Sequence, residues 1–281
     1  MKQLDCRGRV LALDAPVVMG VLNVTPDSFS DGGLYRGIDD AVAHGRRMAE
    51  QGAAIIDVGG ESTRPGAAAV DAEEELARVI PVIERLARVL DVPISADTSK
   101  PEVIGAAVAA GAGMINDVRA LREPGALETA AASGAAICLM HMLGEPGGMQ
   151  ADPRYEDVVT EVRAFLAARV EACASAGIAP RRLCIDPGIG FGKRPEHNLA
   201  LLGRLDELTA GAIPVLVGVS RKSLIGIITG RATADRLAGS VALAALCAEH
   251  GAAIVRAHDV AETVDAVRTG AALRRAALQR S

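Results

Sequence analysis

Residues 93–118, PISADTSKPEVIGAAVAAGAGMINDV, contain the structural unit on which the fold of this chain depends. A short apolar run, 93–97, is followed by a helix-patterned segment, 101–110, which begins at Pro101 and stops before Gly111. Proline is tolerated in a first helical turn, and a glycine just past a helix readily adopts the left-handed conformation. A second apolar run, 114–118, comes next, so the stretch predicts a strand, a helix and a second, parallel strand.

The same alternation continues along the whole chain. Continuous apolar strands, each followed by a helix, are typical of a parallel sheet whose faces are covered. Eight such units without a break in composition predict an α/β fold, a single (β/α)8 TIM barrel, with an open doubly wound sheet as the alternative. The expected strands are 17–22, 55–60, 93–97, 114–118, 136–142, 183–186, 215–220 and 253–258, and the expected helices are 39–51, 72–90, 101–110, 124–133, 155–176, 196–209, 233–250 and 260–275.

Length and composition agree with one domain over residues 1–281. Half of the 281 residues are hydrophobic (50%), which is enough for a large core without disulfides or a structural metal. We expect residues 1–16 to form a short N-terminal extension at the barrel bottom and 276–281 to be a frayed tail. The formal net charge of -5 indicates no nucleic-acid partner and no anionic membrane surface as a partner.

The five cysteines predict the compartment. They are scattered, odd in number and without a C-x-x-C spacing, a pattern that fits free thiols in a reducing environment. The N-terminal residues contain no uninterrupted apolar segment of the kind found in signal peptides, and no long apolar stretch predicts a membrane span. We therefore expect a cytoplasmic protein.

Polar residues stand at the C-terminal ends of the expected strands, where a barrel of this kind forms its ligand site. Side chains alternate between the faces of a strand, so Arg256 and His258 share one face, as do Ser95 and Asp97. Each residue alone has a structural explanation, such as capping the next helix, and we expect only that for Asp117 and Asp259. The convergence of many strand ends predicts a site that contains Asn23, Asp97, Asn116, Asp186, Arg256 and His258.

The chemistry of these side chains fits a flat, anionic ligand. Carboxylate and amide groups can bind the edge of a nitrogen-rich heterocycle, and Lys222, Arg256 and His258 supply positive charge for phosphate or carboxylate. No cluster of histidines and carboxylates predicts a protein-only metal site, so a divalent ion such as Mg²⁺ would be held largely by substrate phosphate and water. Residues 24–33 and 61–68, which are flanked by glycine, are candidate lids.

Long motifs identify a family. The chain reads MGVLNVTPDSFSDGG at 19–33, IDVGGESTRPG at 56–66, DPGIGFGK at 186–193 and GVSRKS at 218–223, with shorter matches at 96–98, 115–118 and 256–259. Over about residues 17 to 265 the sequence resembles the dihydropteroate synthases, pterin-binding enzymes of folate biosynthesis and the targets of sulfonamides. The resemblance implies a homodimeric transferase that condenses 6-hydroxymethyl-7,8-dihydropterin diphosphate with 4-aminobenzoate, giving 7,8-dihydropteroate and diphosphate by an SN1-like displacement at the pterin methylene.

The resemblance also implies a role for each matching residue. Asn23 would bind the Mg²⁺ that the diphosphate carries. Residues implied to be catalytic are Asp97, Lys222, Arg256 and His258. Residues implied to bind the pterin diphosphate are Thr63, Asp97, Asn116, Met140, Asp186, Phe191, Lys222, Arg256 and His258. Residues implied to surround 4-aminobenzoate are Phe29, Arg64, Pro65 and Ser223.

Two other functions fit part of the pattern. A folate-dependent methyltransferase of the pterin-binding family could share the Asp and Asn groups that hold the pterin, but it has little use for the two substrate loops or for Ser-Arg-Lys-Ser at 220–223. A barrel that binds pterin without catalysis is expected to have lost Asn23, Arg64 or His258, and all three are present. Both observations favour the synthase.

Overall fold

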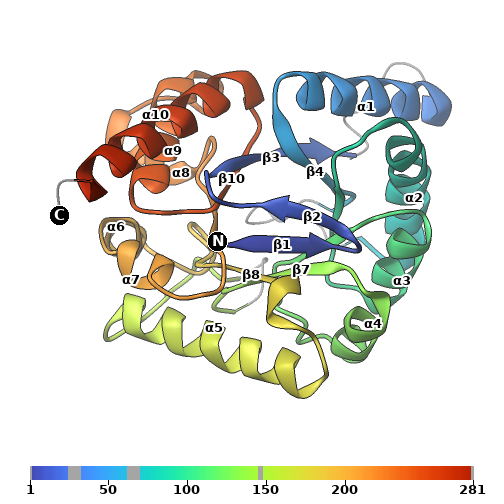
Figure 1. The fold of residues 1–281 in the computed structure, drawn as a ribbon, viewed down its shortest axis with the longest axis horizontal. Helices are drawn as coiled ribbons and strands as arrows, with labels where there is room; N and C mark the ends of the chain where they lie inside the picture. Colours follow the sequence, from blue (N-terminus) through green and yellow to red (C-terminus); the bar gives the residue numbers. More distant parts are fainter. Residues whose placement is uncertain (1, 25–32, 62–69, 145–147, 280–281) are drawn as a thin grey trace.

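The computed structural model describes residues 2–24, 33–61, 70–144 and 148–279. Eight parallel strands form one sheet in the order β8-β7-β6-β5-β4-β3-β10-β9, and a bridge between Ile185 and Val215 joins the two outer strands, which closes the barrel (Figure 1). The predicted TIM barrel is confirmed, and the open-sheet alternative is excluded. The strands are β3 (Val17–Asn23), β4 (Ala53–Gly59), β5 (Ile94–Asp97), β6 (Met114–Asp117), β7 (Ala136–Met140), β8 (Leu183–Asp186), β9 (Leu216–Gly218) and β10 (Ile254–Ala257).

Helices surround the barrel on its outer side (Figure 1). Several end at the glycines expected from the sequence, since Gly52, Gly111, Gly134, Gly177 and Gly251 all have positive φ values. The helices are α1 (Gly33–Glu50), α2 (Ala72–Val89), α3 (Pro101–Ala109), α4 (Ala126–Ser133), α5 (Val158–Ser175), α6 (Pro195–Gly203), α7 (Asp206–Thr209), α8 (Ser223–Thr229), α9 (Leu237–Glu249) and α10 (Val260–Leu278), with 3-10 turns η2 (Pro180–Arg182) and η3 (Thr233–Asp235).

The structure corrects two of the expected helices and adds one that was not expected. The segment expected at 196–209 is two helices, α6 and α7, and the one expected at 233–250 begins as the separate turn η3. Helix α8 was not predicted, because its sequence, SLIGIIT, contains a glycine and three isoleucines, which have low helix propensity. The prediction failed there because tertiary packing overrides weak local preference.

The N-terminal residues form an antiparallel hairpin, β1 (Gln3–Cys6) and β2 (Arg9–Ala12). Leu4 and Cys6 are buried in a cluster with Met19, Ile55 and Met114, which lie near the N-terminal ends of their strands. The hairpin crosses the barrel in Figure 1 on the side from which the strands begin. It therefore covers the bottom of the barrel, at the end opposite the C-terminal strand ends.

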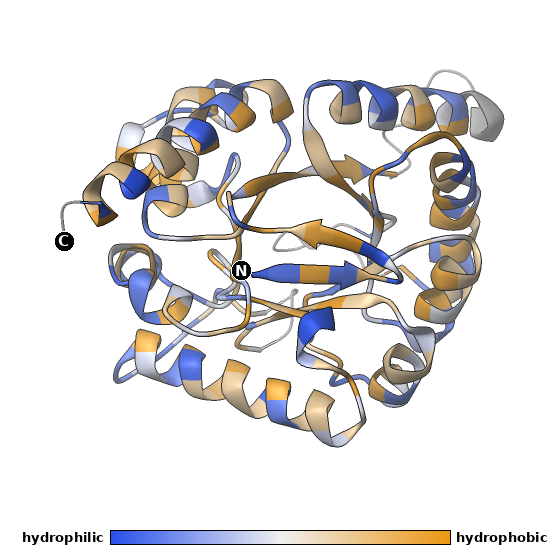
Figure 2. Ribbon diagram, viewed as in Figure 1, coloured by the Kyte–Doolittle hydropathy of each residue, from blue (hydrophilic) through white to orange (hydrophobic). Residues whose placement is uncertain are grey.

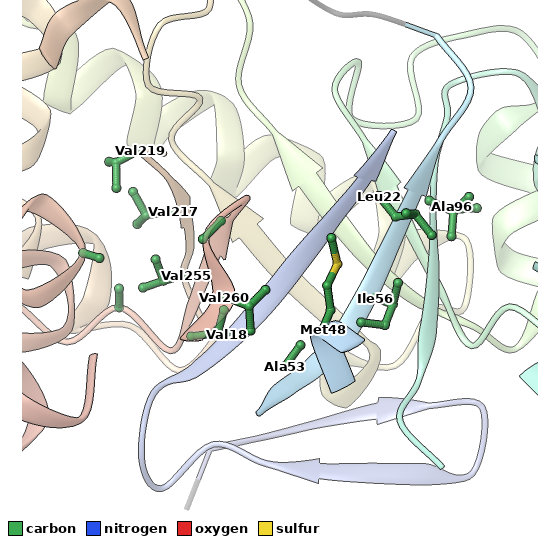
Figure 3. Close-up of a cluster of buried hydrophobic side chains, with 14 of the residues drawn as sticks. Val18, Leu22, Met48, Ala53, Ile56, Ala96, Val217, Val219, Val255 and Val260 are labelled. Atoms are coloured by element: carbon green, nitrogen blue, oxygen red, sulfur yellow. The ribbon is translucent and has the colours of Figure 1, made fainter. Parts of the chain in front are cut away.

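Two apolar layers hold the barrel together. One lies inside it, and the other lies between strands and helices, where Val18, Leu22 and Ile56 are buried (Figure 3). Hydrophobic residues dominate the strands of the barrel, whereas the helices alternate hydrophobic and hydrophilic residues around their axes (Figure 2). This arrangement is the one expected when a parallel sheet is covered by amphipathic helices. Within the described ranges, no helix combines the length and the apolar character needed to cross a bilayer.

Replacing a fully buried strand residue tests this outer layer. Ile56 is 0% exposed, so Ile56→Ala should lower the free energy of unfolding by about 2 to 5 kcal/mol through lost burial and the cavity left behind. Val89, which is 52% exposed at the end of α2, provides the control. Val89→Ala should change the free energy of unfolding by less than about 0.5 kcal/mol. Denaturant unfolding measures both, and equal losses would contradict the assigned packing.

Candidate active site

The guanidinium of Arg256 lies between two carboxylates at the C-terminal end of the barrel. Arg256 Nε donates to Asp57 Oδ2 at 2.7 Å, and Arg256 Nη2 donates to Asp97 Oδ2 at 2.7 Å. The side chains of Arg256, Asp57 and Asp97 are 22%, 0% and 10% exposed. Burial works to lower the pKa of Arg256, but the charges of the two aspartates outweigh it and raise the pKa, so the guanidinium stays charged.

Asn116 belongs to the same cluster. Its Nδ2 donates to Asp57 Oδ2 at 3.0 Å. The side chains of this cluster therefore come from four strands, β4, β5, β6 and β10. The structure thus brings together the predicted residues Asp97, Asn116 and Arg256. It adds Asp57, to which the sequence analysis assigned no role. The available signal was a carboxylate within the apolar run AAIIDVGG, since an ionised group is seldom buried without a partner.

The Asp97 carboxyl has a shifted pKa. Burial raises it to about 7. The positive charge of Arg256 opposes this increase, while the nearby carboxylates of Asp57, Glu75 and Asp117 add to it. Carboxyl groups with such values are common in functional sites, because the charge that burial makes costly is the one a ligand later stabilises.

A second group of residues lies at the ends of β8 and β9. Lys222 Nζ donates to the carbonyl oxygen of Ile189 and lies 4.4 Å from the centre of the Phe191 ring. Burial lowers the pKa of Lys222 to about 8, and the charge of Asp186 opposes that shift. Burial also raises the pKa of Asp186, which accepts a 2.7 Å hydrogen bond from the Gly188 backbone N–H. The predicted residues Asp186, Phe191 and Lys222 are therefore neighbours.

Met140 forms the apolar floor beside this group. It is buried with Val118, Met142 and Met149, and Phe191 packs against the cluster. A flat ring placed over these side chains would have apolar contacts on one face and polar groups along its edge.

The turn that carries Phe191 is held in place by Lys193. The Nζ of this buried lysine lies 2.9 Å from His141 Nδ1 and donates to the carbonyl oxygens of Gly188 and Phe191 at 2.9 and 3.0 Å. Burial lowers the pKa of Lys193 to about 7. Gly188 has φ +68, and a Cβ there would lie 1.9 Å from the His141 carbonyl oxygen, so no other residue fits this close approach.

His258 is positioned by the end of β9. Its backbone N–H donates to Ser220 Oγ at 3.2 Å, and its Nδ1 lies 3.0 Å from the same oxygen. The sequence analysis expected Asp259 and Asp117 to act as caps or as hydrogen-bonding groups of their loops. Asp117 does so, whereas Asp259 does not cap α10 and makes its hydrogen bonds with Arg221, 38 residues earlier. Asp259 accepts two from Arg221, and Asp117 accepts from the backbone N–H groups of residues 119 and 121.

The remaining predicted residues are placed only in part. Asn23 is the last residue of β3 and is exposed, and Ser223 is exposed at the first position of α8. Within the described ranges, no group of three or more His, Cys, Asp or Glu side chains is arranged to hold a metal ion. The candidate lids lie largely outside the described residues, as do the four predicted ligand contacts Phe29, Thr63, Arg64 and Pro65.

Comparison with known proteins decides what kind of site this is. The model of the pterin binding enzyme family matches residues 19–258. The chain belongs to this family, among the dihydropteroate synthases. It is 54% identical to the dihydropteroate synthase of Escherichia coli K12 over 266 residues, which cover 95% of this chain and 94% of that one.

Solved structures agree with this assignment. The Yersinia pestis dihydropteroate synthase, in complex with a sulfonamide drug, superposes with a TM-score of 0.92 at 52% identity and covers 97% of this chain and 99% of that one. The Xanthomonas albilineans dihydropteroate synthase with 4-aminobenzoic acid has a TM-score of 0.90 at 57% identity and covers 97% of this chain and 98% of that one. The chain is therefore a transferase of folate biosynthesis with a pterin-binding barrel.

The raised pKa of Asp97 predicts a particular dependence of stability on pH. Because its folded pKa of about 7 lies above that of an unfolded aspartate, folding takes up a proton between about pH 4 and 7. The contribution of Asp97 to the free energy of unfolding should therefore fall as the pH rises through this window, by up to about 4 kcal/mol.

Denaturant unfolding of the wild type and Asp97→Asn at several pH values measures this contribution as a difference. Asparagine does not titrate, so the difference between the two proteins should decrease from pH 4 to pH 7 and then level off. A difference that stays constant across the range would show that Asp97 keeps an ordinary pKa.

Proposed function

We propose that this chain joins 6-hydroxymethyl-7,8-dihydropterin diphosphate to 4-aminobenzoate, giving 7,8-dihydropteroate and releasing diphosphate. The observation that carries the proposal is the buried cluster of Arg256, Asp57, Asp97 and Asn116 at the barrel mouth, meaning the C-terminal ends of the strands. A pterin has amino and ring N–H donors along one edge and needs acceptors and a planar cation beside it. The cluster supplies both.

The pterin would lie between the two groups of residues in the site. Asp97, Asn116 and Asp186 present oxygen acceptors to its edge, and Lys222 adds a donor. Met140 and Phe191 offer the apolar surface on which one face of the ring rests. The planar guanidinium of Arg256, held by two carboxylates, can stack on the ring or bind the diphosphate.

The diphosphate would be bound by Arg256, His258 and Thr63, together with Mg²⁺. Within the described ranges, no group of three or more His, Cys, Asp or Glu side chains is arranged to hold such an ion. Asn23, an exposed residue at the end of β3, would contribute an amide oxygen, and phosphate and water would supply the other ligands. When bound, Mg²⁺ would neutralise charge on the departing diphosphate.

The second substrate would occupy the outer part of the site. Ser223 begins α8 and directly follows Lys222, which lies against the Phe191 ring, so the position proposed for 4-aminobenzoate would adjoin the proposed pterin pocket. The contacts proposed for 4-aminobenzoate are Phe29, Arg64, Pro65 and Ser223. A sulfonamide has the same aryl amine and a similar acidic group, so we expect sulfonamides to compete at this position.

The charges suit a dissociative, SN1-like displacement. The bond between the pterin methylene and the diphosphate oxygen breaks first, and the electron-rich pterin stabilises the cation. The neutral aryl amine then forms the new C–N bond, and its nitrogen loses a proton to the released diphosphate or to water. Asp97 and Asp186 would stabilise positive charge on the pterin, whereas Arg256 and His258 would stabilise the leaving group. No strong base is required, and closure of the two substrate loops over the cation would exclude water.

The test of this function is direct. The purified protein, given the pterin diphosphate, 4-aminobenzoate and Mg²⁺, should form dihydropteroate and diphosphate in equal amounts, and a chelator or a sulfonamide should reduce the rate. A protein that binds the pterin but yields no product would instead be a non-catalytic pterin-binding barrel.

Substitutions of Arg256 and Ser223 should affect the binding of the two substrates differently. Removing one partner of a buried charge pair costs about 2 kcal/mol or more, so Arg256→Ala should weaken binding of the pterin diphosphate by roughly 30-fold or more. Its effect on 4-aminobenzoate should be smaller, and Ser223→Ala should show the reverse order. Calorimetric titration of each variant measures both affinities, and the opposite pattern would refute these placements.

We also propose that the protein is a homodimer that pairs through α8, α9 and α10. Among the described residues, six of the ten exposed large hydrophobic side chains lie on these three helices, which are neighbours in Figure 1. Exposed apolar residues gathered in one region commonly mark a protein interface. They are Ile227, Ile228, Leu237, Leu246, Leu273 and Leu278.

A charge placed on this surface should weaken the dimer. Ile228 is 57% exposed, so Ile228→Asp should lower the dimer fraction without unfolding the barrel, because burying an unpaired carboxylate is costly. Val10, which is 60% exposed on the hairpin at the barrel bottom, gives the matched control Val10→Asp. Sedimentation over a range of concentrations measures both, and a dimer unaffected by Ile228→Asp would place the interface elsewhere.

We place the protein in the cytoplasm. The five cysteines are all free thiols in the structure and all are buried, which suits a reducing compartment. Detection of the protein in fractionated cells checks this location.

A further inference from the structure

Asp57 lies deeper in the barrel than Asp97, by two residues along the strands. It is on β4, where it pairs in register with Ser95 of β5, while Gly59 pairs with Asp97 at the strand ends. Its side chain is 0% exposed. A carboxylate so placed contacts no ligand directly, so its effect on the site must pass through its neighbours.

The first neighbour is the Asn116 amide, whose orientation Asp57 decides. An ionised carboxylate only accepts hydrogen bonds, so the Asn116 NH₂ group must face it, as the 3.0 Å bond from Nδ2 to Asp57 Oδ2 shows. The Asn116 oxygen is thereby left as an acceptor for an N–H group of a ligand. With the amide reversed, the pocket would present a donor at this place and repel that group.

The second neighbour is Arg256. Asp57 Oδ2 accepts a hydrogen bond from Arg256 Nε at 2.7 Å, and Asp97 accepts one from Arg256 Nη2. Two hydrogen bonds to different nitrogens of the planar guanidinium fix the orientation of its plane. Nη1 makes no hydrogen bond to the described part of the chain and remains available to a ligand. Asp57 accepts the hydrogen bonds from Asn116 and Arg256 through the same oxygen, Oδ2. Its Oδ1 has no partner among the described residues.

We propose that Asp57 is the positioning residue of the pterin pocket, which turns the Asn116 oxygen and the Arg256 Nη1 toward the ligand without touching it. The proposal rests on the proposed function for the identity of that ligand, the pterin diphosphate. It assigns to the buried aspartate a part in substrate recognition that is separate from the roles of Asp97 and Asp186.

Substitution of Asp57, with Ser95 as control, tests the proposal. Ser95 pairs in register with Asp57, is equally buried, and its Oγ has no partner among the described residues, so Ser95→Ala removes a polar group outside the network. Asp57→Ala should weaken binding of the pterin diphosphate, measured by calorimetry with Mg²⁺ present, by roughly 10- to 100-fold. Ser95→Ala should leave that affinity unchanged, and 4-aminobenzoate affinity should change little in either variant.

A double-mutant cycle shows whether the effect passes through Asn116. In an Asn116→Ala background there is no amide to orient, so adding Asp57→Ala should cost less affinity than it does in the wild type. Asp57→Asn keeps the shape of the side chain and provides a second measure if Asp57→Ala does not fold. It removes a charge that raises the pKa of Asp97 and lets Arg256 pair more fully with that residue. The proposed function needs an ionised Asp97, so kcat/KM of the wild type should fall as the pH drops below the Asp97 pKa of about 7, and in Asp57→Asn this fall should occur at lower pH.

Three results would overturn the proposal. They are wild-type affinity for the pterin diphosphate in Asp57→Ala, losses in Asp57→Ala and Asn116→Ala that simply add, and an unshifted pH profile in Asp57→Asn. A purely structural role would lower the melting temperature and leave the two losses of affinity additive. Formation of dihydropteroate by the wild type is scored separately, so failure of the proposed function is distinguishable from failure of this inference.

Discussion

Arg256 is held between Asp57 and Asp97, and the arrangement of the site depends on this one buried bridge. An isolated charge in a protein interior is costly, and removing one partner of a buried pair typically costs about 3 to 5 kcal/mol. The three groups therefore require one another, and they come from three different strands. Because a shift of one residue turns a strand's side chains to the opposite face, the bridge is compatible with only one register of β4, β5 and β10.

The bridge also links stability to function. Burial is the main reason that the pKa of Asp97 is raised, and the second carboxylate around the guanidinium, Asp57, adds to the increase because it leaves a surplus of negative charge. A ligand that brings N–H donors or developing positive charge relieves the surplus. The proposed pterin cation has both properties. Negative charge that is unfavourable in the free protein would therefore stabilise the cation that forms during the reaction.

The other side of the pocket is built by close packing of the backbone. Gly188 approaches the His141 carbonyl more closely than any side chain allows, and Lys193 gathers the surrounding carbonyl oxygens around a single nitrogen. This turn sets Phe191 beneath Lys222. Preorganised groups of this kind do not have to move during the reaction, which is how a site without a strong base can still accelerate it.

The amino-acid sequence by itself determined the barrel and most of its mouth. Apolar runs of strand length separated by helices predict the eight units, and the alternation of side chains along a strand predicts that Asp97, Asn116, Asp186 and Arg256 share the C-terminal end. These inferences need only local periodicity, and the structure confirms the barrel and brings these residues together at its mouth. They could not supply α8, whose isoleucine-rich sequence has weak helix propensity and becomes a helix only through its packing.

Tertiary structure alone decided which groups contact each other. Asp57 and Arg256 are 199 residues apart, and Asp97 and Arg256 are 159 apart, so no spacing in the sequence reveals either pair. The same is true of Lys193 with His141 and of His258 with Ser220. Hydrogen bonding depends on distances of about 3 Å between atoms that only the closed barrel brings together, whereas periodicity specifies no more than the face of a strand on which a side chain lies.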